Sequence, residues 1–308
     1  MDFGRVRELR DGRVMVADAR DKVVSVVDFR SGNATTVGRE GSGPQEFGLP
    51  MRLYIAPNDT TLLYDPLNQR YLLIGPDAKP INTFRTEGEP AAPRPGAGPQ
   101  MIAMGLFGRI TDARGRIYGE ASPFTMGPDG RPQTADSAAI IRYDRGTRRI
   151  DTLAYVKLQQ QNAQVSGGQN NMRVMIGGAN PLAPRDEWTV FPDGRVAIVR
   201  AADYHVDWVM PNGTKRSSPP IAYTPVRMNA AEIRHEENLR NLARANQMSV
   251  SMSMGPNGTQ RTAQMGPPPN APPLEPLTDW PAVKPPFRAG FTSVLARPNG
   301  ELWVRRTE

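Results

Sequence analysis

The sequence predicts an all-β fold made of repeated four-stranded antiparallel units, and three observations point to it. The 308 residues include 29 glycines and 31 prolines, which interrupt helices too often for a long helical bundle. A turn followed by an alternating or apolar strand recurs five times along the chain. In the first four copies, a second strand and a second turn follow at a similar spacing.

The first turn of each copy contains Asp, Asn or Arg beside Gly, or the Asn58-Asp59 pair. Such residues favour tight hairpin turns, because they accept a backbone conformation with positive φ. Each turn leads into a strand of alternating or apolar residues. The five copies are Asp11–Asp18, Asn58–Asp65, Arg114–Ala121, Asp193–Arg200 and Asn299–Arg306.

The second turns close a second hairpin in each of the first four copies. The spacing from Gly12 to Gly32 is 20 residues and that from Gly194 to Gly213 is 19. A strand also precedes each first turn, and a short strand follows each second turn. The sequence therefore predicts four-stranded meanders over residues 3–38, 50–86, 104–156 and 186–218, with an insertion in the third.

A four-stranded meander is the blade of a β-propeller, so we expect one propeller domain over residues 1–308. A β-sandwich is the competing all-β architecture, but it does not account for the repeated unit. The chain ends eight residues after Gly300, which leaves four blades and half of a fifth. A fragment of a longer propeller, blades built from insertions, and an open ring all fit this incomplete count.

The segment Gly38–Pro50 reads GREGSGPQEFGLP. It resembles the Gly-x-x-Gly-x-Gly-Pro-Gly-Glu-Phe-x-x-Pro linker of NHL-type repeats, with Gln45 where the family usually has Gly. Val16-Ala-Asp18 followed by Lys22-Val23 resembles the strand pair of the same repeats. The chain is therefore similar to bacterial six-bladed β-propeller proteins related to NHL repeats. The resemblance is closest over residues 1–86, and it implies the six-bladed type and an exported protein, periplasmic or extracellular, with its signal peptide removed.

Composition limits the classes of function. The absence of cysteine excludes disulfides, thiol catalysis and cysteine-bound metals. The net charge of +7 is spread along the chain without a run of five like charges, so we expect a solvated surface and no nucleic-acid partner. The longest nearly apolar stretch, residues 101–108, is too short to cross a membrane.

Few residues are available for catalysis. His205 and His235 are the only histidines, and neither a Gly-x-Ser-x-Gly nor a His-Glu-x-x-His motif occurs. The glycine-rich segment 38–43 opens no helix and is typical of a crossing between blades. We therefore assign no catalytic residues, no cofactor and no metal site.

Carboxylates recur near the end of one strand in the first three copies, at Asp18, Asp65 and Glu120. Oxygen ligands from several blades could hold calcium on a propeller axis, as in lactonase-type hydrolases. The alternative is turn chemistry, in which each carboxylate accepts bonds from nearby backbone amides. Arginine holds this place in the last two copies (Arg200, and Arg305 or Arg306), which favours turn chemistry.

Residues 221–286 form one long insertion with the strongest helix signal in the chain. Asn229 and Glu232 predict a capped helix over residues 229–248, followed by a low-complexity loop over 249–273. The helix either docks a partner or packs on its own propeller, and the insertion could also cover a sheet edge. The predicted partner-binding residues share one helix face: His235, Leu239, Leu242 and Ala243.

Two other segments carry weaker signals. Residues 159–178 predict either a long exposed loop or a small extra hairpin. Met248, Met252, Met254 and Met265 could bind a soft metal, but no His or Cys lies nearby in the sequence, so no metal is assigned.

These patterns favour a non-enzymatic scaffold that binds another protein or ligand, as a subunit of a larger assembly. The alternative is a calcium-dependent hydrolase of the lactonase type, with the metal on the propeller axis.

Overall fold

The computed structural model describes residues 3–86, 108–121, 124–126, 132–134, 136–158, 162–166, 173–177, 180–245, 248–255, 258–267, 273–274, 276–288 and 293–307. Two compact units make up the chain. The first comprises residues 1–91, 104–119 and 142–151, and the second comprises 92–103, 120–141 and 152–308.

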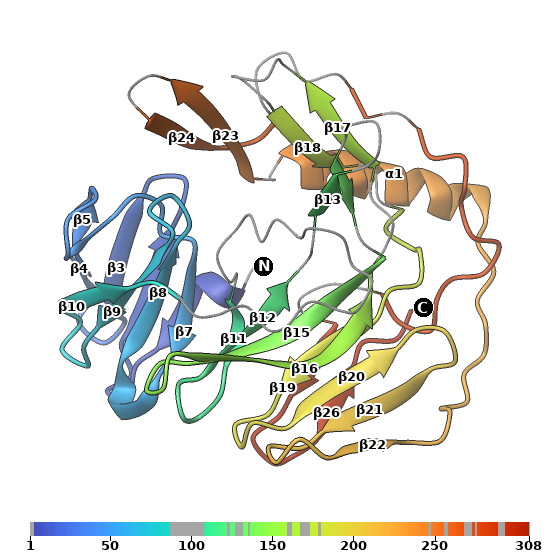
Figure 1. The fold of residues 1–308 in the computed structure, drawn as a ribbon, viewed down its shortest axis with the longest axis horizontal. Helices are drawn as coiled ribbons and strands as arrows, with labels where there is room; N and C mark the ends of the chain where they lie inside the picture. The colour runs from blue at the N-terminus through green and yellow to red at the C-terminus, as the bar shows by residue number, and fades with distance from the viewer. Residues whose placement is uncertain are drawn as a thin grey trace. The chain divides into compact units, whose positions relative to one another are not determined.

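Four antiparallel sheets of four strands dominate the described chain, and each follows sequence order (Figure 1). The first contains β1 (Val6–Glu8), β2 (Val14–Asp18), β3 (Val23–Asp28) and β4 (Asn33–Thr36). The second contains β7 (Arg52–Ile55), β8 (Thr61–Asp65), β9 (Arg70–Ile74) and β10 (Pro80–Phe84). The third contains β11 (Gly108–Thr111), β12 (Ile117–Ala121), β15 (Ser137–Asp144) and β16 (Arg149–Lys157). The fourth contains β19 (Glu187–Val190), β20 (Val196–Arg200), β21 (His205–Val209) and β22 (Lys215–Ser217).

These sheets confirm the predicted fold class: all-β, with four-stranded propeller blades in the predicted places. A further hairpin, β25 (Val294–Ala296) with β26 (Leu302–Val304), supplies the half of a fifth blade. The remaining elements are η1 (Phe3–Arg5), β5 (Arg39–Glu40), β6 (Glu46–Phe47), η2 (Pro57–Asp59), β13 (Phe124–Met126), β14 (Pro132–Thr134), β17 (Asn162–Ser166), β18 (Arg173–Gly177), α1 (Ala230–Ala245), β23 (Met248–Gly255) and β24 (Gly258–Met265).

The first hairpin of every blade has the same register. Five pairs of facing residues occupy equivalent positions: Arg7 and Met15, Tyr54 and Leu62, Ile110 and Tyr118, Thr189 and Ala197, and Leu295 and Trp303. Each hairpin turn has a left-handed residue at the same place, a glycine in four blades and Asp59, with φ of 55°, in the second, where Asn58 is also left-handed. The turn chemistry that the sequence predicts therefore fixes which residues face each side of every sheet.

Two apolar clusters show how this register builds the core. In the first unit, Met15 and Val26 of the first sheet pack with Leu63 and Leu72 of the second. In the second unit, Ala197 and Val206 of the fourth sheet join Phe287 and Val294, beside the half-blade. Alternate residues of each strand thus pack face to face between neighbouring sheets within a unit.

The glycine-rich crossing in the first unit is held by carboxylates. Strands β5 and β6 pair in parallel, and Glu46 accepts bonds from the amide of Gly43 (2.8 Å) and from Arg39 (2.6 Å). Asp65, fully buried at the end of β8, accepts the amides of Gly48 and Leu49 at 3.0 Å each. The segment that resembles the NHL linker is therefore a structural crossing, as the sequence predicts.

The insertion differs from its prediction at the end of the helix. Helix α1 ends at Ala245 instead of Met248, and Met248 begins β23. The predicted low-complexity loop over 249–273 contains the antiparallel hairpin of β23 and β24, which pairs Met248 with Met265. The alternation of Met or Val with Ser over 248–254 has the two-residue period of a strand, which outweighs its low complexity. Of the two alternatives for 159–178, the hairpin is correct, as β17 and β18.

Gly108 offers a test of the packing within the first unit. A Cβ atom there would lie 2.6 Å from the hydroxyl oxygen of Tyr71, which accepts the Gly108 amide at 3.0 Å. It would also lie 2.8 Å from a methyl carbon of Ile117. We expect Gly108→Ala to lower the free energy of unfolding by about 1–3 kcal/mol, measured by denaturant titration. Gly146→Ala, where the nearest atom would lie at 3.3 Å, is the matched control, and an equal loss there would contradict the prediction.

Candidate partner-binding site

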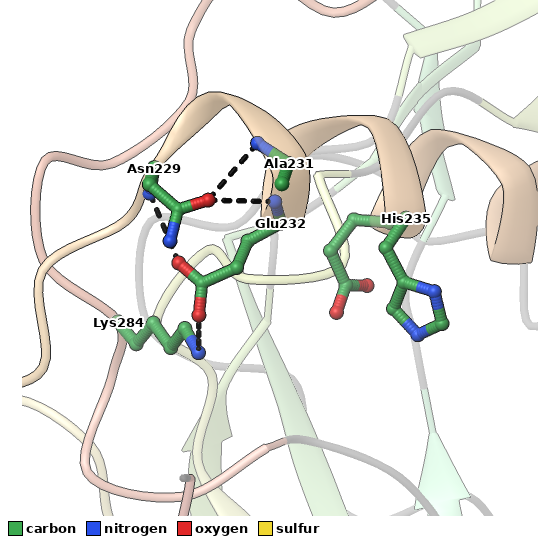
Figure 2. Close-up of a pocket in the computed structure, with 6 residues that line it drawn as sticks. Asn229, Ala231, Glu232, His235 and Lys284 are labelled. Atoms are coloured by element: carbon green, nitrogen blue, oxygen red, sulfur yellow. Dashed lines mark hydrogen bonds and ion pairs between the residues drawn. The ribbon is translucent and has the colours of Figure 1, made fainter.

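Helix α1 begins with the capping arrangement that the sequence predicts. The side-chain oxygen of Asn229 accepts the amides of Ala231 (2.9 Å) and Glu232 (3.0 Å), and Glu232 accepts the amide of Asn229 at 2.9 Å (Figure 2). Lys284 donates to the other oxygen of Glu232 at 2.5 Å. The bond from Lys284, followed by that from Asn229, lowers the pKa of Glu232. The helix start is therefore fixed both locally and to a segment distant in sequence.

The side of α1 that packs against the protein is charged. Glu236 is the buried residue of the helix among those described, and its two oxygens accept from the two terminal nitrogens of Arg288 at 2.8 and 2.5 Å. Two backbone bonds join the flanking segments, from Met228 to Ala282 and from Lys284 to Val226. A fork-shaped guanidinium–carboxylate pair gives direction as well as attraction, so it fixes how the helix is rotated.

The predicted partner-binding residues lie on the side of α1 next to Glu236, with Leu239 three and Ala243 seven residues after it. His235, Leu242 and Ala243 are exposed, Leu242 to 60%, and Leu239 is half-buried. We call the side of α1 that carries these four residues its outer face, and its edge at Leu239 adjoins the buried Glu236. Leu242 itself does not pack against the chain, whereas the ion pairs of Glu232 and Glu236 attach the helix to it.

A shallow cavity of about 390 Å³ lies beside the first turns of the helix. Asn229, Ala231, Glu232, His235, Glu236 and Lys284 line it. Figure 2 shows the ring of His235 beside the bonded network and outside it. Of the four predicted site residues, His235 alone lines the cavity. Lys284 and Arg288 were missed, since each lies 52 residues from its carboxylate partner and no local pattern joins them.

A second charged cluster lies at the end of the fourth sheet. Arg200 donates to Asp186 and to Asp207, each at 2.7 Å. His205 lies between Asp203 (2.6 Å from Nδ1) and Asp207 (3.1 Å from Nε2). The bond to Asp203 raises the pKa of His205 above its ordinary value of 6.5, with a smaller contribution from Asp207. Burial opposes the ionised form of Asp207, yet bonds from Ser217 and Arg200 leave its pKa lowered.

The strand-end carboxylates each accept hydrogen bonds from groups that lie nearby in the structure. Asp18 accepts the amides of Arg20 and Asp21 in its turn, at 2.8 and 3.1 Å. Glu120 accepts from Arg185 at 3.0 Å and from the indole of Trp188 at 2.7 Å. Asp18 and Asp65 thus accept backbone amides, as the turn-chemistry alternative predicts, whereas Glu120 accepts from side chains that are distant in sequence.

The hairpin register also corrects the predicted alignment of these positions. Asp18, Asp65 and Arg200 are equivalent, since they face Val23, Arg70 and His205 at the start of the next strand. Glu120 lies one position earlier in its strand, so it does not belong to the set. In the half-blade, Arg306 rather than Arg305 is the equivalent residue.

The described ranges contain no group of three or more His, Cys, Asp or Glu side chains placed to hold a metal ion. No helix within those same ranges has the length and hydrophobicity needed to span a bilayer.

Comparison with known proteins gives distant likenesses in structure only. No family model matches the chain, and no curated protein matches it. Virginiamycin B lyase from Staphylococcus aureus is 12% identical, with a TM-score of 0.28 over 71% of this chain and 85% of its own. A gluconolactonase from Xanthomonas campestris is 9% identical, with a TM-score of 0.32 over 82% of each chain. A DUF4221 family member from Bacteroides vulgatus is 9% identical, with a TM-score of 0.38 over 97% of this chain and 80% of its own. At these values, none of the likenesses indicates a shared activity.

Removing the guanidinium of Arg288 tests how the helix is held. Arg288→Ala leaves the buried Glu236 without its charged partner, so we expect a loss of about 1–2 kcal/mol and faster hydrogen exchange of the α1 amides. Lys284→Ala breaks the pair with Glu232, whose side chain is more exposed than that of Glu236 and keeps its bond from the Asn229 amide, so this change should cost less than about 1 kcal/mol. An equal or larger effect of Lys284→Ala would contradict this assignment.

His205 predicts a pH dependence of stability. Its pKa is raised in the folded protein, so the stabilisation is fully present below pH 6.5 and is lost as the pH rises through the folded pKa. The free energy of unfolding should therefore decline over this window, and His205→Asn should remove that decline. His235→Asn is the matched control and should retain it. A decline that persists unchanged in His205→Asn would refute the role of His205.

Proposed function

We propose that this protein is a non-enzymatic β-propeller scaffold that binds another protein through the outer face of α1. One observation carries the proposal: the helix buries a glutamate against its own chain and exposes a leucine. A helix that only covered its own propeller would gain most by burying Leu242 and leaving Glu236 in water. The observed orientation favours a surface kept for a partner.

The spacing of the exposed residues suits one mode of recognition. His235, Leu239 and Leu242 lie at positions i, i+4 and i+7, which place three anchors along one side of a helix. A partner with an apolar groove would receive them. Because the capping box and the Arg288 pair fix the helix beforehand, little conformational entropy would be lost on binding.

We also propose that the protein acts outside the cytoplasm, in the periplasm or beyond the cell. The resemblance of residues 38–50 to the linkers of exported bacterial propellers supports this location, and the partner would then be an envelope or extracellular protein.

A photo-crosslinking amino acid at position 242 tests both proposals. We expect one defined protein adduct, recovered in the envelope fraction or the medium. With the crosslinker moved to the neighbouring position 238, the yield of this adduct should fall at least about tenfold when Leu239→Ser and Leu242→Ser are introduced together. The free energy of unfolding should change by less than about 0.5 kcal/mol for Leu242→Ser, because its side chain is mostly exposed.

The control places the same crosslinker at Ile55, which is 64% exposed in β7 of the second sheet, and should give no such adduct. If positions 242 and 55 yield the same adducts, the outer face of α1 is not a binding surface. An adduct confined to the cytoplasm would refute the location alone.

A further inference from the structure

The outermost strand of the first blade has an edge without the usual protection against strand pairing. β4 contains Asn33, Ala34, Thr35 and Thr36, and all four residues are exposed. In the described chain, β4 pairs with β3 alone. The strand contains no charged residue and no proline. Such an edge offers unpaired backbone amides and carbonyls to another strand.

The outermost strands of the other three complete blades carry features that hinder strand addition. β10 begins with Pro80, which has no amide hydrogen, and its register is irregular beside that residue. β16 carries Arg149 at one end and Lys157 at the other. β22 carries Lys215 and Arg216. Proline, irregular register and charge are means by which sheets block an edge, so β4 is the exception among the four.

The chain after β4 turns back towards the inner strands of the same blade. Gly38, with φ of 67°, follows the end of β4, and the next strand, β5, contacts β3. Lys22, just before β3, forms an ion pair with Glu40 of β5. The open edge of β4 therefore lies inside the chain and in a complete blade, so it does not depend on where the sequence begins or ends.

The ladder between β3 and β4 determines which backbone groups reach the open edge. Val37 donates its amide to the carbonyl of Val24 at 2.8 Å, so these two residues form a hydrogen-bonded pair. Because such pairs alternate along an antiparallel ladder, Thr35 also bonds towards β3. The amides and carbonyls of Ala34 and Thr36 then point to the open edge, where they can bond to an added strand.

Two copies of β4 match each other about a twofold axis. When Thr35 lies opposite the partner's Thr35, antiparallel order places Ala34 opposite the partner's Thr36, and the reverse. The outward amides and carbonyls of both residues are then paired in each copy. Facing threonines stabilise an antiparallel pair, and no like charges meet along β4.

We propose that β4 is a dimerisation strand, which pairs antiparallel with β4 of a second copy of this chain about a twofold axis at Thr35. Both subunits then use the same surface, as a closed dimer requires. The interface is small, and the net charge of +7 on each copy opposes association, so the dimer is expected to be weak. β4 belongs to the first unit and α1 to the second, so this proposal and that for α1 can fail separately.

Sedimentation of the full chain over a range of concentrations tests the dimer. We expect an equilibrium between monomer and dimer. Thr35→Lys should weaken it at least about fivefold, because two ammonium groups would face each other at the axis, and Thr35→Glu should do the same with two carboxylates. Thr224→Lys makes the same change of charge at an exposed threonine outside the strands and should leave the dissociation constant unchanged. A chain that stays monomeric at every concentration would overturn the proposal, as would a dimer that Thr35→Lys does not weaken.

A mixture of the two charged variants tests the register. Lys and Glu at position 35 would face each other across the axis, so the mixture should associate at least about fivefold more tightly than either variant alone. Thr35→Lys mixed with Thr224→Glu should not recover in this way. If the first mixture does not recover, Thr35 does not face its own copy and the proposal fails.

A backbone change tests the same edge without added charge. Ala34→Pro removes an amide hydrogen from the open edge and none from the ladder to β3, so it should weaken the dimer at least about fivefold. Because Ala34 and Thr35 are exposed, the variants at both positions should keep the melting temperature of the parent within a few degrees. A folded Ala34→Pro variant that dimerises as well as the parent would contradict the pairing.

Discussion

One left-handed residue in the first turn of each blade is the constraint on which the rest of the structure depends. It sets the register of the first hairpin, and a shift of one residue would turn every side chain to the opposite face of the sheet. Four blades meet the requirement with glycine and the second with Asp59. The buried positions of Met15 and Ala197 follow from this turn geometry.

The same register places residues of opposite charge at equivalent strand ends. Asp18 and Asp65 occupy equivalent places and resemble a repeated chemical feature of the chain. Each nevertheless accepts bonds from backbone amides of its own region. Arg200 holds that place in the fourth blade and bridges Asp186 and Asp207. A position with an unchanging place in the ladder thus takes residues of either charge, because its role is to satisfy whichever polar groups lie beside it.

Local patterns were sufficient to predict the blades and the capped start of α1, because turns, alternation and capping act over a few residues. They were insufficient for the orientation of the helix. Leu239 and Leu242 define an apolar face in the sequence, but Lys284 and Arg288 decide which face turns inward, and both lie far along the chain. The hairpin of β23 and β24 was missed because low complexity was given more weight than alternation. Glu120 was misaligned because its strand was matched by residue type rather than by register.

Because ion pairs attach α1, substitutions on its exposed surface and substitutions in the sheets differ in their effect on folding. Substitutions in the sheets alter packed surfaces, so most of them carry a folding penalty. Substitution of Leu242, which is 60% exposed, alters less packing, while the ion pairs of Glu232 and Glu236 hold the helix. Exposed helix residues such as Leu242 can therefore be exchanged without loss of the fold, so evolution can alter the surface of the helix independently of the sheets.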